Sequence, residues 1–471
     1  MGRWLGLSLG ESVHWVTLTC HSVHREERML TDACFVSSAV SVAPAGSAVD
    51  LKPPRGTRDF PPEEMRARNW LFGAFHEVAR SFGFEEWDAP VLESEELYVR
   101  KAGEEITSQL FNFEDKGGRR VSLRPELTPS LTRIALAKGA SLPLPAKWYA
   151  VGQCWRYERT TRGRRREHYQ WNMDVIGAAG VSAEAELLAA IAALFTKLGL
   201  SAEDVGIKVS SRKLLQGVAA KYGVEDDLFA PVCIAVDKLD KIGAEKVSEE
   251  LAELGVATDA AEGILRALAM RSLDDLAEEL GEESEVVVEL RELWALCEGY
   301  GIADWLVFDA SVVRGLAYYT GTVFEAFDRA GELRAICGGG RYDTLLQTMA
   351  GGREDRSQPM VGFGFGDAVI MELLSDKGLL PEAASTADDV VAVMDAELRP
   401  QALGVAARLR AKGRRVDVVL DKRKFKWIIR QAERVGAQRL LLVGQTEWDE
   451  GKVRVKNLAE REEDDVPLDE L

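Results

Sequence analysis

The chain has 471 residues, 46% of them hydrophobic and 29% charged, with a formal net charge of −18, which is typical of a globular protein with about three domains. No apolar run approaches the roughly 18–20 residues of a membrane span, and the acidic total argues against binding nucleic acid through bulk charge. The six Cys form no CxxC pair, and only His76 and His168 lie beyond the first 25 residues, so neither a disulfide framework nor a multi-histidine metal site is expected.

Residues 1–50 differ from the rest of the chain because they show no helical or strand period. An organellar transit peptide is rich in Arg and poor in acidic residues, whereas this segment contains Glu11, Glu26, Glu27 and Asp32. Two interpretations stay open: a poorly conforming or mis-assigned N-terminus without ordered structure, or a removable targeting leader.

The elements between residues 52 and 374 change in type along the chain. Two Pro before a helical stripe predict a helix over 63–82, followed by an edge strand over 84–91. Strand signals follow at 110–113, 120–123, 146–157 and 169–176, then a helix at 184–199, a mostly helical stretch at 211–300, and strand signals at 305–309, 321–327, 333–337 and 359–366. This order predicts an α+β domain, residues 52–374, with an antiparallel sheet and a helical insertion at about 212–300.

Residues 375–388 have the composition of a linker, and a different pattern begins after them. Segments that predict strands alternate with helical segments at 390–394, 398–412, 416–420, 424–435 and 439–443. Such a βαβαβ alternation predicts a small α/β domain with a parallel sheet over residues 389–471. The acidic residues at its end are expected to be frayed.

The charge of this second domain is opposite to that of the whole chain. Twelve basic and three acidic residues between Arg408 and Arg439 give a local balance of +9. A charge run is usually a solvated surface, but Phe425 and Trp427 lie among these basic residues and could stack on bases. Two interpretations of this basic face therefore stay open: a solvated surface, or a surface that binds nucleic acid.

A second basic run, at 156–166, has six Arg in eleven residues around Gly163 in a predicted hairpin. This density within an apolar strand context is hard to explain by packing, and guanidinium groups match phosphate geometry. The following strand carries Gln170, Asn172 and Asp174 at alternate positions, so these side chains share one face. The hairpin therefore predicts a binding site for a polyphosphate or for RNA phosphates.

Three further segments combine polar residues with sharp turns. At 123–130 a strand meets a helix, with Thr128 as the expected cap and Glu126 as a carboxylate that could hold a substrate ammonium. Segment 308–325 places an Arg and two adjacent Tyr near glycines, and 337–343 contains three consecutive Gly that permit close backbone approach to a ligand. Neither is a GxxxxGK[ST] phosphate loop. Taken alone, each segment is also explained by capping or aromatic packing.

Together these segments resemble the histidyl-tRNA synthetases, a family of class II aminoacyl-tRNA synthetases, over about residues 52–460. The motifs that carry the resemblance are RGTRDFPP at 55–62, LRPELT at 123–128, RYERTTRGRRREHYQWNMDVIG at 156–177, VRGLAYYTGTVFE at 313–325 and GGGRYD at 338–343. The resemblance implies ATP-dependent ligation of L-histidine to histidine tRNA through a histidyl-adenylate. It also implies a class II catalytic domain, a C-terminal anticodon-binding domain and a homodimer.

For ATP, the resemblance implies that Arg156 and Arg314 contact the α-phosphate and are catalytic. It places Glu158 and His168 at the adenine side and Arg164 at the outer phosphates. His168 stands where the family usually has a stacking Phe. Two Arg and a Mg²⁺ supply the alignment and charge stabilisation that activation of a carboxylate needs, and no protein-held metal site is implied.

For histidine, the resemblance implies buried polar partners, because an imidazole both donates and accepts hydrogen bonds. These residues are Glu126, Thr128 and Gln170 for the α-amino group, Asp174 and Tyr319 for the imidazole, and Tyr318 as a wall of the pocket. Many members have Glu at the position of Asp174. For tRNA, the resemblance implies the basic residues Lys422, Arg423, Lys424, Lys426 and Arg430.

One position departs from the pattern of the family. The third class motif normally ends in Arg, but Val369 holds that position in this chain. The missing contact with the γ-phosphate could come from Arg353 or Arg356. The segment at 362–374, GFGFGDAVIMELL, looks more like the organellar or cyanobacterial branch. Together with the leader, it favours a chloroplast or mitochondrion over the cytoplasm.

Two non-catalytic alternatives share this fold. One is the synthetase paralogue that regulates ATP phosphoribosyltransferase, which generally lacks the C-terminal tRNA domain. The other is an RNA-binding sensor with an inactive synthetase fold, which only Val369 favours. This chain keeps Arg156, Arg314 and residues 389–471, and these features argue for the enzyme.

Overall fold

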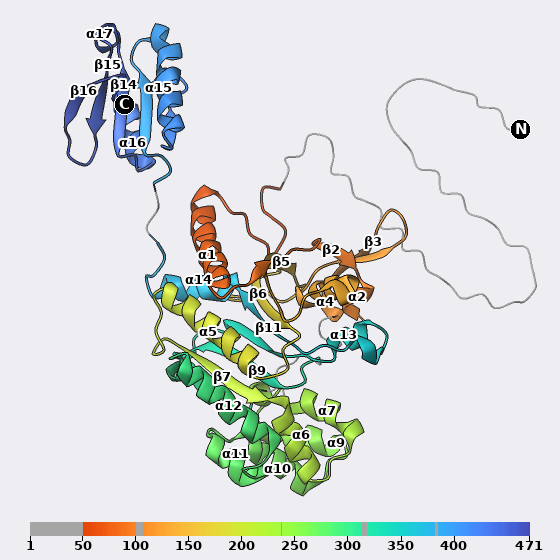
Figure 1. The fold of residues 1–471 in the computed structure, drawn as a ribbon. Helices are drawn as coiled ribbons and strands as arrows, with labels where there is room; N and C mark the ends of the chain where they lie inside the picture. Colours follow the sequence, from red (N-terminus) through yellow and green to blue (C-terminus); the bar gives the residue numbers. More distant parts are fainter. Residues whose placement is uncertain (1–49, 100–106, 237, 313–317, 382–384) are drawn as a thin grey trace, which may run out of the picture. The chain divides into compact units, whose positions relative to one another are not determined.

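The computed structural model describes residues 50–99, 107–236, 238–312, 318–381 and 385–471 (Figure 1). The expectations for the leader at 1–49 and for Arg314 fall outside these residues. In this described part of the chain, no helix has the length and hydropathy that crossing a membrane requires.

The first part of the chain is built on an eight-stranded sheet with the strand order β1-β5-β6-β11-β10-β9-β7-β8. Its strands are β1 (Glu85–Glu86), β5 (Ala146–Trp155), β6 (Glu167–Ile176), β7 (Val205–Ser211), β8 (Leu306–Phe308), β9 (Thr322–Asp328), β10 (Cys337–Arg341) and β11 (Met360–Gly366). Neighbours run antiparallel except at the two edges, where β1 pairs with β5 and β7 pairs with β8 in parallel. The predicted antiparallel sheet is therefore present.

The two faces of this sheet differ because polar and apolar residues alternate along its central strands. On β6, Trp171, Met173 and Val175 belong to the main hydrophobic core. On the neighbouring β11, Phe363 and Phe365 join the same core. The intervening residues therefore lie on the opposite face, which leaves a polar surface above the middle of the sheet.

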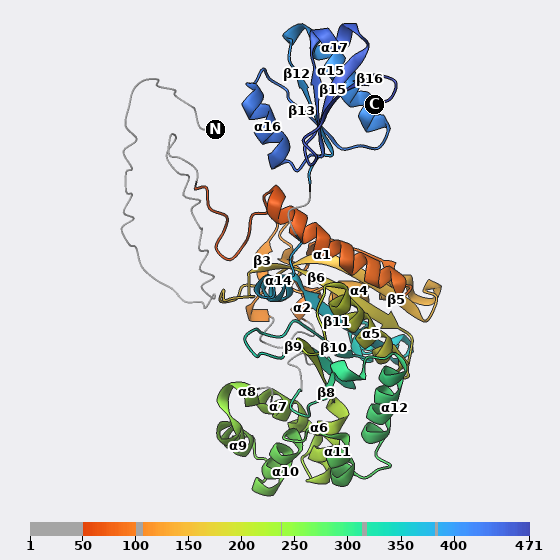
Figure 2. The same ribbon diagram turned by 90° about the vertical axis from the view of Figure 1, so that its left-hand side faces the viewer.

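Helices cover the apolar face and one end of the sheet. Helix α1 (Pro62–Ser81) and helix α5 (Ser182–Lys197) pack against each other, and α5 also contacts β11. Between β7 and β8 the chain forms the predicted helical insertion (Figure 2). The insertion helices are α6 (Arg212–Lys221), α7 (Asp226–Val236), α8 (Leu239–Ile242), α9 (Ala244–Glu253), α10 (Thr258–Leu268), α11 (Leu273–Leu280) and α12 (Glu285–Gly299).

A second sheet interrupts the strand that the sequence predicted over 84–91. Only Glu85 and Glu86 pair with the large sheet, and the next strand, β2 (Leu92–Ser94), belongs to a three-stranded sheet with β3 (Phe111–Glu114) and β4 (Arg120–Leu123). The prediction of one continuous strand was therefore wrong, although β1 does lie at the edge of the large sheet. Pro90 lies between the two pairing segments and has no N–H for a ladder. The short helix α2 (Glu96–Val99) follows β2.

The three glycines of the GGGRYD motif form part of a strand rather than a ligand-binding loop. This strand, β10, covers Cys337–Arg341 and therefore begins where the strand predicted over 333–337 was expected to end. These residues lie between β9 and β11 in a tightly packed sheet. A Cβ on Gly339 would stand 2.4 Å from the carbonyl oxygen of Gly362. The glycines are needed for packing between strands, which a pattern of strand propensity cannot reveal.

The remaining helices of this part are short or follow a strand directly. They are α4 (Thr128–Lys138), η1 (Gly139–Ser141), η2 (Ala303–Trp305), α13 (Leu345–Met349), η3 (Glu354–Arg356) and α14 (Asp367–Asp376). Helix α14 begins immediately after β11, at the end of the strand where Gly366 pairs with Gln170.

Residues from Asp389 onward form a five-stranded sheet with the order β13-β12-β14-β15-β16. Its elements are β12 (Asp389–Val393), η4 (Ala396–Leu398), α15 (Arg399–Ala411), β13 (Val416–Val418), α16 (Phe425–Arg434), β14 (Arg439–Val443), α17 (Gln445–Asp449), β15 (Lys452–Asn457) and β16 (Glu463–Pro467). Strands β12, β13 and β14 are parallel, as predicted. Helices α15 and α16 contribute to two separate cores formed by alternate residues of the central strands.

Two expectations for this region were wrong. The acidic end of the chain is not frayed, because β15 and β16 form an antiparallel hairpin and Leu471 is buried. The twelve basic residues do not form one face either. Arg414 and Arg439 both pair with the buried Asp389, while other basic side chains extend from α15 and bond to backbone carbonyls.

Candidate active site

The polar face of the large sheet has a floor of glycine. Gly362 and Gly364 of β11 pair with Asp174 and Asn172 of β6. A Cβ on Gly362 would lie 2.0 Å from Oδ1 of Asp174, and one on Gly364 would lie 1.8 Å from Nε2 of Gln170. In the GFGFG segment, the aromatic side chains therefore pack in the core on one face. The glycines leave space on the other face for the polar side chains of β6.

Two buried carboxyl groups lie on this face, each with a tyrosine partner. The hydroxyl of Tyr318 donates to Oε2 of Glu126 at 3.0 Å. The hydroxyl of Tyr342 donates to Oδ1 of Asp174. The rings of Tyr318 and Tyr342 meet edge to face with centroids 5.7 Å apart, and the ring of Tyr319 lies 5.1 Å from that of Tyr318. The three tyrosines form a wall between the two carboxyl groups.

Burial makes both carboxyl groups harder to ionise. Loss of solvent raises the pKa of Glu126, and the positive charge of Arg156 and the hydroxyl of Tyr318 partly offset this effect. Burial raises the pKa of Asp174 from 3.8 to about 7, and repulsion from Glu126 adds to the shift while the hydroxyl of Tyr342 opposes it. Within the described residues, Oδ2 of Asp174 and Oδ1 of Asn172 are buried acceptors without a hydrogen-bond partner. Such a face suits a ligand that brings hydrogen-bond donors and positive charge.

The pKa of Asp174 predicts a stability change that depends on pH. A carboxyl group with a raised pKa in the fold costs stability as pH rises from its unfolded value of 3.8, and the cost is complete above about 7. Replacing Asp174 with Asn removes that cost, so the variant should gain about 2–3 kcal/mol more over the wild type at pH 8 than at pH 5. Thermal unfolding of both proteins without ligand at the two pH values checks this. An equal difference at both would contradict it.

A cationic region borders this face at the start of β6. Arg156 donates from Nε to the carbonyl oxygen of Pro125 at 2.9 Å, which anchors its guanidinium beside Glu126. Burial lowers the pKa of His168 to about 3, and the charges of Arg156, Arg58 and Arg164 lower it further, against a hydrogen bond with Gln170. The imidazole of His168 is therefore neutral near pH 7 and can stack as an uncharged ring.

Of the other residues that the sequence assigned to ATP, Arg164 and Glu158 lie together, whereas Arg353 and Arg356 lie elsewhere. Arg164 forms an ion pair with Glu158, so these two side chains lie together. Arg353 pairs with Asp355 at 2.8 Å, and both side chains are exposed. Both residues precede Met360, the first residue of β11. Gly366 and the arginine hairpin lie at the opposite end of that strand. The expectation that Arg353 or the neighbouring Arg356 replaces the missing motif arginine was therefore wrong.

Thr128 is the first residue of α4 rather than its cap. Leu127 is the N-cap residue and makes no side-chain cap hydrogen bond. The carbonyl oxygen of Thr128 accepts from the hydroxyl of Thr132 at 2.8 Å. The capping expectation was wrong because Pro129, which follows directly, already fits the first turn without an N–H.

Sequence reasoning missed two functional neighbours of this face. Tyr342 was quoted in the GGGRYD motif but given no role, and it is the hydroxyl that contacts Asp174. Arg58, in the RGTRDFPP motif, donates from Nε to Glu167 at 2.7 Å and from Nη2 to Asp367 at 3.0 Å. The unassigned polar residues within each quoted motif were the available signal for both.

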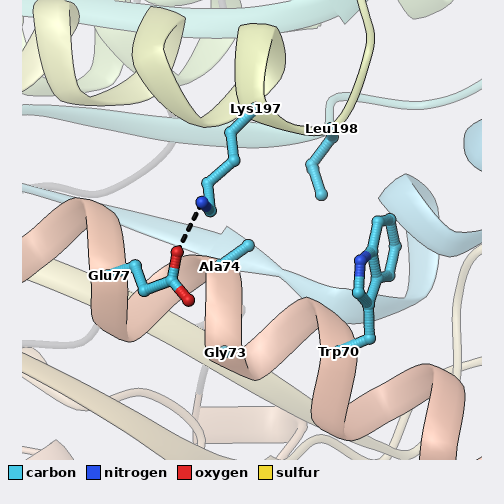
Figure 3. Close-up of a pocket in the computed structure, with 6 residues that line it drawn as sticks. All are labelled: Trp70, Gly73, Ala74, Glu77, Lys197 and Leu198. Carbon is cyan, nitrogen blue, oxygen red and sulfur yellow. Dashed lines mark ion pairs between the residues drawn. The ribbon is translucent and has the colours of Figure 1, made fainter.

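A hollow of about 310 Å³ lies on the other side of the sheet (Figure 3). It is lined by Trp70, Gly73, Ala74 and Glu77 of α1 and by Lys197 and Leu198 at the end of α5. Lys197 and Glu77 form an ion pair across it (Figure 3). None of the residues that the sequence assigned to a site lines this hollow.

The basic residues assigned to tRNA lie at the start of α16. Lys422, Arg423 and Lys424 precede the helix, and Lys426 and Arg430 follow within it, all exposed. The guanidinium of Arg423 lies 5.1 Å from the ring centroid of Trp427. Phe425 and Trp427 are each 41% exposed. This surface, residues 422–430, therefore combines cations with accessible aromatic rings.

The antiparallel sheet with its glycine-floored polar face and arginine hairpin, followed in the chain by a separate α/β unit, defines a class II aminoacyl-tRNA synthetase. Residues 56–366 match the family model described as histidyl-tRNA synthetase, and residues 388–471 match that of an anticodon binding domain. The chain belongs to the histidyl-tRNA synthetase family, whose members use ATP as a substrate.

Relatives and solved structures agree with this membership. The chain is 56% identical over 423 residues to the histidine–tRNA ligase, chloroplastic/mitochondrial, of Arabidopsis thaliana. The matched region covers 90% of this chain and 86% of that protein. It is 37% identical to the histidine–tRNA ligase of Haloarcula marismortui, over 88% of this chain and 95% of that one. The crystal structure of histidyl-tRNA synthetase from Nostoc sp. PCC 7120 superimposes with a TM-score of 0.73 at 26% identity, covering 90% of this chain and 98% of that one.

Proposed function

We propose that this protein ligates L-histidine to histidine tRNA in two steps. In the first, the carboxylate of histidine attacks the α-phosphorus of ATP, the bond to the β-phosphate breaks, and histidyl-adenylate and pyrophosphate form. In the second, a terminal hydroxyl of the tRNA attacks the activated carbonyl and AMP leaves. The observation that carries the proposal is the pair of buried carboxyl groups, Glu126 and Asp174, on one face beside Arg156.

Histidine fits this face because it has a cationic ammonium at one end and an imidazole at the other. We assign Glu126, with Thr128 and Gln170, to the ammonium. Asp174, with Tyr319, takes the imidazole, and Tyr318 holds Glu126 in place through the observed hydrogen bond. Tyr342 does the same for Asp174. A site of buried polar groups rejects amino acids that would leave those groups unpaired.

ATP occupies the region of the arginine hairpin in this proposal. Arg156 and Arg314 contact the α-phosphate, Arg164 the outer phosphates, and Glu158 and His168 the adenine side. A Mg²⁺ ion bound with the nucleotide would supply charge that neutralises the phosphates. Such an ion would be bound mainly through the phosphates, with one or two carboxylates.

The direct test of this function is charging of tRNA transcripts by the full chain. Histidine tRNA should be aminoacylated with histidine, whereas transcripts for other amino acids should not. Charging of a different tRNA, or of histidine tRNA with a different amino acid, would contradict the proposal.

For the tRNA, we assign the surface at 422–430 to the anticodon region, with Trp427 as a stacking platform. Stacking of one base on an aromatic side chain contributes about 1–3 kcal/mol, so Trp427→Ala should raise the KM for tRNA roughly 5–100-fold. Histidine-dependent pyrophosphate exchange, which needs no tRNA, should be unchanged. Leu403→Ala is the matched control, because Leu403 is a comparably exposed apolar residue on α15. Equal effects of the two variants on the KM for tRNA would refute the assignment.

Two further proposals concern assembly and location. We propose that the protein is a homodimer, which sedimentation velocity would test. We also propose that it works in a chloroplast or mitochondrion, with residues 1–50 as the targeting leader. The Arabidopsis relative that is named chloroplastic/mitochondrial supports this location. Import of a reporter fused to residues 1–50 would test it.

A further inference from the structure

The tip of the arginine hairpin lies against helix α14. Arg162 contacts both carboxylate oxygens of Asp376 from Nη2, at 2.6 and 2.5 Å, and donates from Nε to Glu372 at 3.2 Å. Nη2 of Arg165 lies 3.9 Å from the same Glu372. These ion pairs join residues more than 200 positions apart in the chain, so they fix a tertiary contact rather than a local turn.

The residues of α14 that meet the hairpin form one stripe. Val369, Glu372 and Asp376 are spaced three and four residues apart, which places them on the same side of a helix. Val369 contacts the turn itself, since a Cβ on Gly163 would lie 3.1 Å from its Cγ2. The φ of Gly163 is +69°, in the left-handed region that favours glycine.

This contact gives Val369 a structural role. The position that carries an arginine in the usual class motif is here occupied by a small apolar side chain, against which the turn at Gly163 rests. The branched side chain of Val369 is 8% exposed and belongs to the main core. An arginine at this position would have to displace the turn or point elsewhere.

We propose that α14 is a docking helix for the arginine hairpin, and that Arg162 is a positioning residue for ATP binding. This inference rests on the proposed function. The tip of the hairpin has a single β-bridge, between Thr161 and Arg164, so its own ladder does little to hold it. The docking contacts supply the missing constraint, and they hold Arg164 and its partner Glu158 where the nucleotide must bind.

The expected effect is moderate, because Arg162 is half-exposed and exposed ion pairs are individually weak. A bidentate pair with a second carboxylate is stronger than a single contact. Without these ion pairs the hairpin can still bind ATP, but its tip must then be ordered when ATP binds. The entropy lost in that ordering weakens binding. The change should therefore be in the KM for ATP, by about 3–10-fold, with the KM for histidine and the kcat little changed.

The experiment measures histidine-dependent pyrophosphate exchange by the full chain in four proteins besides the wild type. Arg162→Met removes the contacts with both carboxylates, whereas Asp376→Asn removes only the ion pair with Asp376. The double variant Arg162→Glu/Asp376→Arg restores the ion pair between these two positions with reversed charges. Arg291→Met is the matched control, because Arg291 is also half-exposed and also bridges two carboxylates, Asp274 and Glu282 in the insertion. Both single variants should raise the KM for ATP, Arg162→Met by more than Asp376→Asn, because Glu372 still accepts from Arg162 when Asp376 is replaced. The double variant should recover at least half of the loss caused by Arg162→Met.

The results separate this inference from its alternatives. If Arg162 touches phosphate directly, Arg162→Met impairs the enzyme while Asp376→Asn does not, and the reversed pair fails to rescue; either result overturns the docking role. A KM for ATP in Arg162→Met equal to that of Arg291→Met also overturns it. Absence of exchange in the wild type would instead refute the proposed function on which the inference rests.

Discussion

Replacing Arg156 with Met is expected to lower the kcat of histidine-dependent pyrophosphate exchange by about 10²–10³, the usual cost of removing one preorganised donor at developing transition-state charge. The structure explains why this arginine should matter most in the hairpin. Its Nε is fixed by the carbonyl oxygen of Pro125 at 2.9 Å, so the guanidinium is oriented before ATP binds. Its charge also partly offsets the raised pKa of Glu126.

A lysine at this position should not restore the rate, because an ammonium cannot hold the Pro125 carbonyl and a phosphate in the same planar fork. Exchange kinetics at saturating ATP and histidine measure the effect, and thermal unfolding shows whether each variant is folded. A folded Arg156→Met protein with a kcat within threefold of the wild type would contradict the assigned role.

Gly364→Ala is expected to raise the KM for histidine about 10–100-fold while leaving the KM for ATP within a few-fold. The added Cβ would lie 1.8 Å from Nε2 of Gln170, the end of a side chain that can swing away. The fold should therefore persist, and the polar face should lose a correctly placed hydrogen bond to a charged group. Such a bond contributes about 1.5–3 kcal/mol, which corresponds to roughly 10–100-fold.

Gly366→Ala is the control on the same strand. A Cβ there meets no atom within 4 Å, and its φ of −83° is ordinary for any residue. This variant should bind histidine as the wild type does. Equal KM values for histidine in the two variants would show that the glycine floor does not shape the amino-acid site.

The part of the site that lies within one strand could be predicted from the sequence. The alternation of Gln170, Asn172 and Asp174 with large apolar residues gives both the strand and its polar face, because a strand has a period of two. The structure places all three on the face opposite the core, as expected. The arginine hairpin was equally visible, since its Gly and its charge density are local features.

The contacts between distant segments could not be predicted in the same way. Tyr342 meets Asp174 across 168 residues, and Arg58 meets Asp367 across 309. Each pairing depends on the order of strands in the sheet, which no local periodicity specifies. The GGGRYD glycines were misread for the same reason: their function is to let β9 and β11 approach, and this only appears once the strands are neighbours.

The basic C-terminal run shows how charge counting can mislead. Its +9 balance suggested one surface, but Asp389, which lies upstream of the counted window on β12, binds two of its arginines. Folding divides the run into pairs that stabilise the sheet and the exposed group around α16. Only the second group can serve a partner, and only the three-dimensional arrangement separates the two.

The measurement that tests the central claim most directly is pyrophosphate exchange by the full chain with each of the twenty amino acids in turn. The account predicts exchange with histidine and none above background with the other nineteen, because only histidine satisfies both Glu126 and Asp174 on the polar face. Folded protein that binds histidine tRNA but exchanges pyrophosphate with no amino acid would contradict it. That result would mean that a hairpin docked on Val369 cannot activate ATP, and it would favour a non-catalytic, RNA-binding role for this fold.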